Sequence, residues 1–136
     1  NTALREKQGL AYSVGVYNDT QLDGGSMVFF IQTDAASIDK AMAGMWDEAK
    51  KLRDVLVEKK ELESVKNYLT GTEAIELQNQ SDLAQRLALS QLYGEGAEHV
   101  FNRRSRLEKV TAEDLKAAAI KFLDADKFAK AVLKPK

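Results

Sequence analysis

Arg5 and Tyr12 stand near the start of the chain, one on each side of Gly9. A tyrosine hydroxyl can donate a hydrogen bond, and a guanidinium is a permanent cation with a planar fork of donors. Gly9 is the residue type best suited to the left-handed position just past a helix end. A helix that stops there and turns back into a strand can bring both side chains toward one spot. Two structural alternatives stay open: a core aromatic for Tyr12 and a solvated helix-end cation for Arg5.

His99 and a pair of glutamates could in principle hold a metal or move protons, but their spacing favours ordinary roles. His99 is the single histidine of the chain and has no histidine partner four residues away on a helix. We expect it to be an exposed structural residue. Glu73 and Glu76 share one helix face at the i, i+3 spacing, and we expect them to form a solvated face.

An arginine cluster and a glycine pair also invite functional interpretations. The cluster at residues 103–106 lies close to Glu98, Glu108 and Glu113, and no aromatic platform accompanies it, so it does not predict a nucleic-acid site. Gly24 and Gly25 lack the following helix and lysine of a phosphate loop, so they indicate a turn.

Composition excludes several classes of protein. The chain has 136 residues, a net charge of −1, no cysteine and one histidine. A near-neutral charge argues against a dedicated binder of nucleic acids or anionic membranes. The lack of cysteine and scarcity of histidine leave no metal site or catalytic triad that this sequence could readily build. No apolar run approaches the roughly 20 residues of a membrane helix, so we expect a soluble protein, cytoplasmic or periplasmic if bacterial.

Hydrophobic periodicity predicts a strand pair followed by helices and a last strand. The strands of the pair are joined by a long, polar, glycine-containing loop. Ser37 is the expected N-cap of the first helix, and Thr111 with Asp114 resembles a capping box for the last. The predicted elements are a helix end at residues 1–8, strands at 10–17 and 26–33, helices at 37–56, 60–76, 83–93 and 97–107, a helix from 111, and a strand at 127–133.

This order predicts an α+β fold with two layers, an antiparallel sheet covered on one face by helices. The length is that of one domain, with no linker or internal repeat inside residues 1–136. The first predicted helix has no cap of its own, so the chain is expected to begin inside an element.

The pattern Arg-x-x-x-Gly-Leu-x-Tyr, formed by Arg5, Gly9, Leu10 and Tyr12, resembles the arginine/tyrosine signature of the pitrilysin/insulinase-like zinc peptidases, the inverzincins. That signature belongs to the second homologous domain of those enzymes. Further segments are similar in order and spacing across nearly the whole chain: residues 23–25, 31–34, 60–62, 92–94, 110–115 and 132–135.

The resemblance implies a clamshell enzyme that cleaves peptides with zinc held in a facing domain by His-x-x-Glu-His and a later Glu. This sequence contains no such motif, so by this resemblance zinc belongs to the full assembly, and the chain alone is expected to be inactive. Tyr12 would donate a hydrogen bond to the oxyanion of the transition state, and Arg5 would hold the substrate backbone.

The resemblance also implies partners. They are a peptide substrate and a zinc-bearing N-terminal domain or partner subunit, with no nucleic acid and no membrane. Residues 1–136 would form the C-terminal lobe of a domain that lacks its first strand-helix-strand portion, so the uncovered sheet could make the fragment self-associate. Two alternatives are a non-catalytic scaffold or regulatory subunit of the same family, and an unrelated interaction module. Substrate specificity and oligomeric state are not specified by the sequence.

Overall fold

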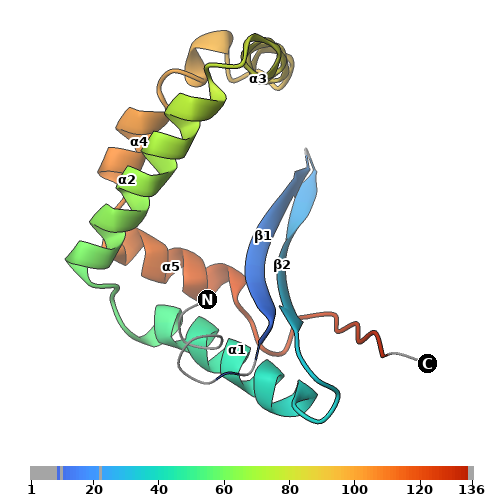
Figure 1. Cartoon of the computed structure of the whole chain (residues 1–136). Helices are drawn as coiled ribbons and strands as arrows, with labels where there is room; N and C mark the ends of the chain where they lie inside the picture. Colours follow the sequence, from blue (N-terminus) through green and yellow to red (C-terminus); the bar gives the residue numbers. More distant parts are fainter. Residues whose placement is uncertain (1–8, 10, 22, 135–136) are drawn as a thin grey trace. The chain divides into compact units, whose positions relative to one another are not determined.

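The computed structural model describes residue 9, residues 11–21 and residues 23–134 (Figure 1). The chain forms two compact units. One unit comprises residues 1–55 and 118–136, and the other comprises residues 56–117.

The first unit is built around an antiparallel hairpin. Strand β1 spans Ser13–Gln21 and strand β2 spans Gly24–Gln32, with an unbroken register from Ser13 opposite Gln32 to Gln21 opposite Gly24. The expected long loop is therefore wrong, because only residues 22 and 23 separate the strands. Polar and glycine residues that usually favour turns are accommodated here in an extended ribbon, as β-propensity depends strongly on context.

Two glycines of the hairpin lie close to the facing strand, and close approach requires glycine at Gly25, which meets backbone. A Cβ at Gly25 would lie 2.5 Å from the carbonyl oxygen of Asp19 on the facing strand. A Cβ at Gly15 would lie 2.6 Å from the ring of Phe30, its register partner, so this ring covers the glycine. Glycine in this ribbon marks backbone or ring contact instead of a turn.

Helix α1 (Ile38–Asp54) and the end of α5 (Ala112–Phe122) cover one face of the hairpin within the first unit. Phe29 and Trp46 pack against a small buried cluster of Ala49, Ala119 and Leu123. The Arg53 guanidinium donates to the Leu123 carbonyl at 2.8 Å and so ties the segment after α5 to α1. An antiparallel sheet with helices on one face confirms the predicted α+β class.

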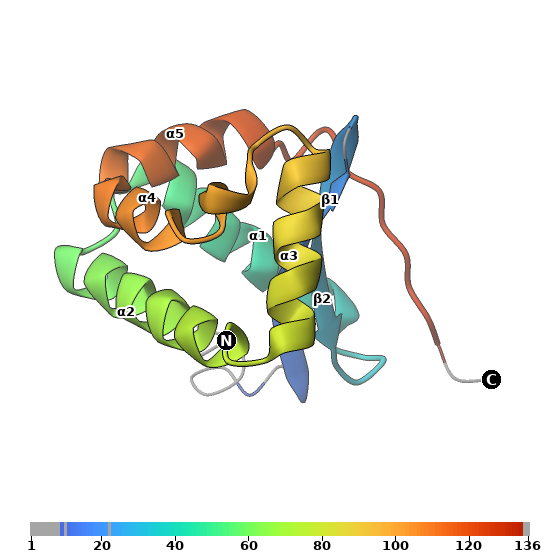
Figure 2. The same cartoon turned by 90° about the horizontal axis from the view of Figure 1, so that it is seen from above.

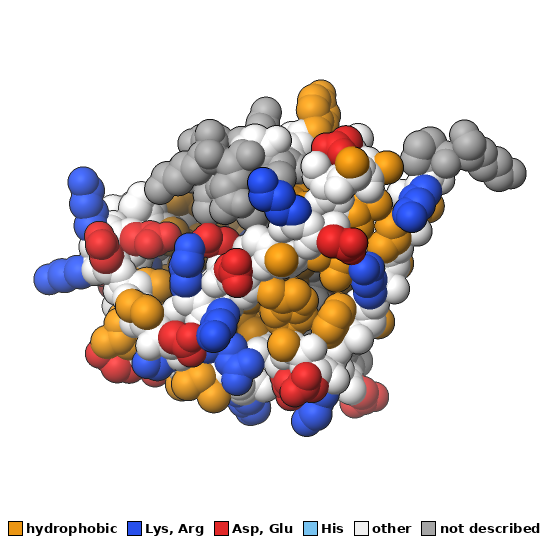
Figure 3. Space-filling view, turned by 90° about the horizontal axis from the view of Figure 1, so that it is seen from below, with side chains coloured by type: hydrophobic (Ala, Val, Ile, Leu, Met, Phe, Trp, Pro, Cys, Tyr) orange, Lys and Arg blue, Asp and Glu red, His pale blue; other side chains and the backbone are white. Residues whose placement is uncertain are grey.

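The core of the first unit is small. Its buried hydrophobic residues, among those described, are Ala11, Ala41, Ala49, Ala119 and Leu123. Many larger apolar side chains lie at the surface, and Figure 3 shows hydrophobic side chains gathered between charged ones on one face.

The predicted strand at residues 127–133 is wrong, because this segment forms no regular secondary structure. Alternating residues make an extended chain possible, but a strand also needs a neighbouring edge to bond. The segment contacts α1 through a side chain instead, since the ring centroids of Phe128 and Trp46 lie 5.0 Å apart in an edge-on arrangement.

The second unit is helical. Helix α2 (Lys59–Glu76) lies beside α4 (Arg103–Lys109), as Figures 1 and 2 both show. Helix α3 (Gln80–Leu92) follows a break at Asn79, whose side chain accepts hydrogen bonds from the Ser81 and Asp82 amides. The helix predicted at residues 60–76 is thus confirmed within one residue, and the expected interruption at residues 79–82 begins a new helix.

The prediction of one continuous helix at residues 97–107 is wrong. A short 3₁₀ turn, η2 (Ala97–His99), is separated from α4 by residues 100–102. The amides of Val100, Phe101 and Asn102 bond carbonyls three residues back, which is the 3₁₀ pattern and cannot continue far with good geometry.

The capping box of α5 is confirmed. The Thr111 hydroxyl accepts a hydrogen bond from the Asp114 amide at 3.1 Å, and the Asp114 carboxylate accepts one from the Thr111 amide at 2.9 Å. The Thr111 hydroxyl also donates to the Asp114 carboxylate at 2.8 Å. The hydrogen bond from the Thr111 backbone amide, and then the one from the Thr111 hydroxyl, lower the pKa of Asp114 below its ordinary value of 3.8.

None of the helices in the described part of the chain is both long enough and apolar enough to cross a membrane.

Candidate functional site

Tyr12 lies at the base of the hairpin, directly before β1. Its backbone amide donates to the carbonyl of Gln32, the last residue of β2, at 2.9 Å. Its side chain is 79% exposed, whereas the preceding Ala11 is buried. The main chain at Tyr12 is therefore anchored while its phenol projects into solvent. This excludes the core-aromatic alternative and leaves the hydroxyl available to a ligand as a hydrogen-bond donor.

Gly9 adopts a positive φ of 59° and so has the left-handed conformation that the sequence predicts for it. Arg5, the second predicted site residue, lies outside the described residues, as does the helix expected at residues 1–8. The convergence of Arg5 and Tyr12 on one spot stays a prediction.

The turn after β2 fixes the strand that anchors Tyr12. The Asp34 carboxylate accepts hydrogen bonds from the Ala36 and Ser37 amides at 3.0 Å each. Hydrogen bonding, chiefly from the Ser37 side chain, lowers the pKa of Asp34 below its ordinary value of 3.8. Ser37 holds the N-cap position as predicted, but its side chain makes no capping hydrogen bond. The sequence interpretation did not predict this role of Asp34. The signal for it is an aspartate three residues before the N-cap, because such a side chain often accepts hydrogen bonds from the next backbone amides.

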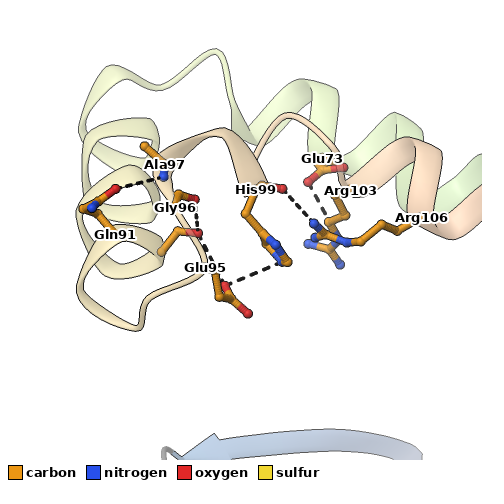
Figure 4. A network of polar contacts seen from close by, with 9 residues as sticks. Glu73, Gln91, Glu95, Gly96, Ala97, His99, Arg103 and Arg106 are labelled. Carbon is orange, nitrogen blue, oxygen red and sulfur yellow. Dashed lines mark hydrogen bonds and ion pairs between the residues drawn. The ribbon is translucent and has the colours of Figure 1, made fainter.

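Glu73 and Glu76 do not form the solvated helix face that their spacing predicts. Glu73 is buried, with 7% of its surface exposed, and its carboxylate lies 3.7 Å from the Nε of Arg103 on α4 (Figure 4). Glu76 pairs with Arg86 of α3. The two carboxylates thus serve separate ion pairs and do not act as an acid/base couple. Their partners lie on other helices, which helix periodicity cannot reveal.

Ser90, Glu95 and His99 come together between α3 and η2, as Figure 4 shows in part. The Ser90 hydroxyl lies 2.9 Å from the Gly96 carbonyl and 3.4 Å from a carboxylate oxygen of Glu95. The His99 Nε2 lies 3.6 Å from the same carboxylate oxygen. A nucleophilic triad needs histidine between serine and acid. Here the acid lies between them and Ser90 is buried, so the group holds the loop and does not activate a nucleophile.

The arginine cluster has internal partners. Arg103 pairs with Glu73, Arg104 pairs with Glu108 at 3.0 Å, and Arg106 donates to the His99 carbonyl at 3.0 Å. Each of these three arginines thus contacts a carboxylate or a carbonyl oxygen within the second unit.

Zinc does not fit the described residues. Over residue 9 and residues 11–21 and 23–134, no three His, Cys, Asp or Glu side chains gather as a metal would require. The single histidine, His99, is partly buried, and its Nε2 lies 3.6 Å from the Glu95 carboxylate. The described side chains therefore offer a hydrogen-bond donor, Tyr12, and no place for a metal.

Comparison with known proteins shows which family and which solved structures this chain resembles. A family model described as the Peptidase M16 inactive domain matches residues 1–69, which include Arg5, Tyr12, the hairpin and α1. A search of curated proteins found no match.

Solved structures share the fold. A candidate zinc protease of Bordetella pertussis Tohama I is 20% identical, with a TM-score of 0.80 over 96% of this chain and 72% of its own. The inactive peptidase domain of a candidate zinc protease of Bordetella parapertussis is 20% identical, with a TM-score of 0.76 and the same coverage of 96% and 72%. The periplasmic protease PqqL of Escherichia coli is 17% identical, with a TM-score of 0.68 over 88% of this chain and 13% of its own.

The TM-scores to these structures show a shared fold. The family model matches half of the chain, residues 1–69, and this match agrees with the fold. The chain belongs to the Peptidase M16 inactive domain family of the zinc peptidases.

Proposed function

We propose that this chain is the substrate-binding lobe of a zinc-dependent peptidase assembly and that Tyr12 contributes directly to peptide cleavage. Family membership supports a place in a peptidase assembly. The position of Tyr12 supports the more specific role, because its backbone is anchored to Gln32 while its hydroxyl faces solvent.

In this proposal Tyr12 donates a hydrogen bond to the carbonyl oxygen of the scissile peptide bond. That oxygen gains negative charge during hydrolysis, and a fixed donor stabilises the charge more than it stabilises the neutral substrate. Arg5 would hold a backbone carbonyl of the same peptide, since a guanidinium donates through two nitrogens at once. The metal would come from a zinc-bearing domain or subunit, so residues 1–136 alone should not hydrolyse peptides.

The test is Tyr12→Phe in the assembly of this chain with the His-x-x-Glu-His domain encoded by the same gene or its neighbour. Loss of one oxyanion donor should lower kcat by about 100-fold while KM changes little. The matched control is Tyr17→Phe, because Tyr17 is also an exposed tyrosine of the hairpin, at 54% exposure. Unchanged turnover for Tyr12→Phe removes Tyr12 from the mechanism and leaves the chain as a scaffold or regulatory lobe.

A further inference from the structure

Thr33 carries the one buried side-chain oxygen or nitrogen, among the described residues, that has no hydrogen-bond partner. A hydroxyl enclosed in this way loses the hydrogen bonds that it makes to water in the unfolded chain and gains none in return. Such atoms are rare in folded proteins, and each one calls for an explanation. Valine has the same branched shape without the oxygen, so it would fill the position without this loss. The Thr33 hydroxyl therefore costs stability, which points to a use outside folding.

Both residues beside Thr33 are held in place. The Gln32 carbonyl accepts a hydrogen bond from the Tyr12 amide at 2.9 Å. The Asp34 carboxylate accepts hydrogen bonds from two backbone amides at 3.0 Å each. The unpartnered hydroxyl thus belongs to a fixed segment in which the neighbouring polar groups do have partners.

Thr33 lies next to the predicted site residue Tyr12. The Gln32 carbonyl and the Thr33 amide belong to one planar peptide group. Since the Tyr12 amide bonds that carbonyl, the main chain of Thr33 begins beside the main chain of Tyr12. Thr33 as a residue is partly exposed, although its hydroxyl oxygen is not. Rotation about χ1 moves the hydroxyl between staggered positions, so it can bring the oxygen to a ligand.

We propose, resting on the proposed function of this lobe, that Thr33 is a further substrate-binding residue whose hydroxyl bonds the main chain of the peptide near Tyr12. A hydroxyl can donate to a peptide carbonyl or accept from a peptide amide, so it suits a main chain of any sequence. The free lobe already carries the loss of an unpartnered hydroxyl. Binding of the peptide then supplies the missing hydrogen bond without a further loss of hydration at this oxygen.

Thr33→Val in the assembly of this chain with the His-x-x-Glu-His domain tests this role. KM for a peptide substrate should rise roughly three- to tenfold while kcat stays nearly unchanged, because the lost hydrogen bond holds substrate and transition state alike. In the 136-residue chain, the midpoint of urea denaturation should rise, since a methyl group replaces an unpartnered buried hydroxyl. Thr33→Ser keeps a hydroxyl and should keep the KM of the unaltered assembly.

Thr20→Val is the matched control. Thr20 is another threonine of the hairpin, but its hydroxyl is exposed and accepts a hydrogen bond from the Asn18 side-chain amide at 3.2 Å. This change should leave KM unchanged and should not raise the urea midpoint.

An unchanged KM for Thr33→Val overturns the proposal, whether the hydroxyl bonds a water molecule or nothing. A lower urea midpoint, or a variant that does not fold, overturns it as well, because the hydroxyl then bonds another part of the protein. Failure here is distinguishable from failure of the proposed function. Unchanged turnover for Tyr12→Phe refutes the catalytic role of Tyr12, whereas a lower kcat for Tyr12→Phe with an unchanged KM for Thr33→Val refutes the role of Thr33 alone.

Discussion

Replacing Arg103 by methionine should destabilise the second unit more than the same replacement of Arg104 on the same helix. Arg103 faces the carboxylate of Glu73, whose side chain is 8% exposed, whereas that of Arg103 is 42% exposed. Without the guanidinium, Glu73 would remain nearly buried with its charge unpaired. Methionine keeps the helix propensity and much of the length of arginine, so the change reports mainly on charge.

The magnitude follows from the burial of the two partners. Breaking a fully buried pair costs about 3–5 kcal/mol because an uncompensated charge stays in the interior. Arg103 is partly solvated, which screens the pair, and this reduces the expected loss to about 1–3 kcal/mol. The control is Arg104→Met on the same helix. Arg104 and Glu108 approach to 3.0 Å, closer than the 3.7 Å of the first pair, but their side chains are 72% and 60% exposed. That loss should be about 0.5 kcal/mol or less.

Native-state hydrogen exchange at the amides of α2 measures these losses, because it reports the unit that holds both residues of the pair. The double variant Glu73→Met with Arg103→Met should be more stable than Arg103→Met alone, since it removes the buried charge as well. A loss for Arg104→Met as large as the loss for Arg103→Met would contradict this expectation, because the distance between the charges would then outweigh their burial.

Two further predictions concern the hairpin and the aspartates. Gly25→Ala should destabilise the first unit by about 1–3 kcal/mol in urea denaturation, because the new Cβ would lie 2.5 Å from the Asp19 carbonyl oxygen. The control is Gly71→Ala in α2, which should not destabilise the protein, because a Cβ there meets nothing within 4 Å. Asp34 and Asp114 have pKa values lowered below 3.8 by hydrogen bonding, so the stability that they contribute is present above that pH and is lost as the pH falls through the lowered values. Denaturation at about pH 5 and about pH 2.5 checks this, and Asp114→Asn should reduce the difference between the two.

Local signals in the sequence predicted several helices and one cap correctly, although the Ser37 side chain does not cap α1 and the helix expected at residues 97–107 is interrupted. The 3.6-residue pattern located α1 and α2, and the Thr111 box was confirmed by its hydrogen bonds. These features depend on residues within one or two turns, so nearby sequence contains the information. The left-handed conformation of Gly9 was also predicted from nearby residues.

Features that depend on distant partners were predicted poorly. The hairpin is longer than expected. Its glycines suggested a turn, but Gly25 lies within the strand and meets the backbone of Asp19 across the ribbon. Glu73 looked solvated because its partner Arg103 lies far along the chain. The last predicted strand, residues 127–133, has the right alternation but pairs with neither β1 nor β2. For the candidate site, sequence identified Tyr12 but could not decide between core and surface, which its 79% exposure settles.

The alanine-rich core of the first unit has a thermodynamic consequence. Unfolding exposes apolar surface, and this exposure is the main source of the heat-capacity increase. Ala11, Ala41, Ala49 and Ala119 are buried there with Leu123 as the one larger hydrophobic residue of the described core. When the unit unfolds, each alanine side chain exposes only a small apolar surface to water. The stability of this unit should therefore vary less with temperature, along a flatter curve, than that of a domain with a leucine- and phenylalanine-filled interior.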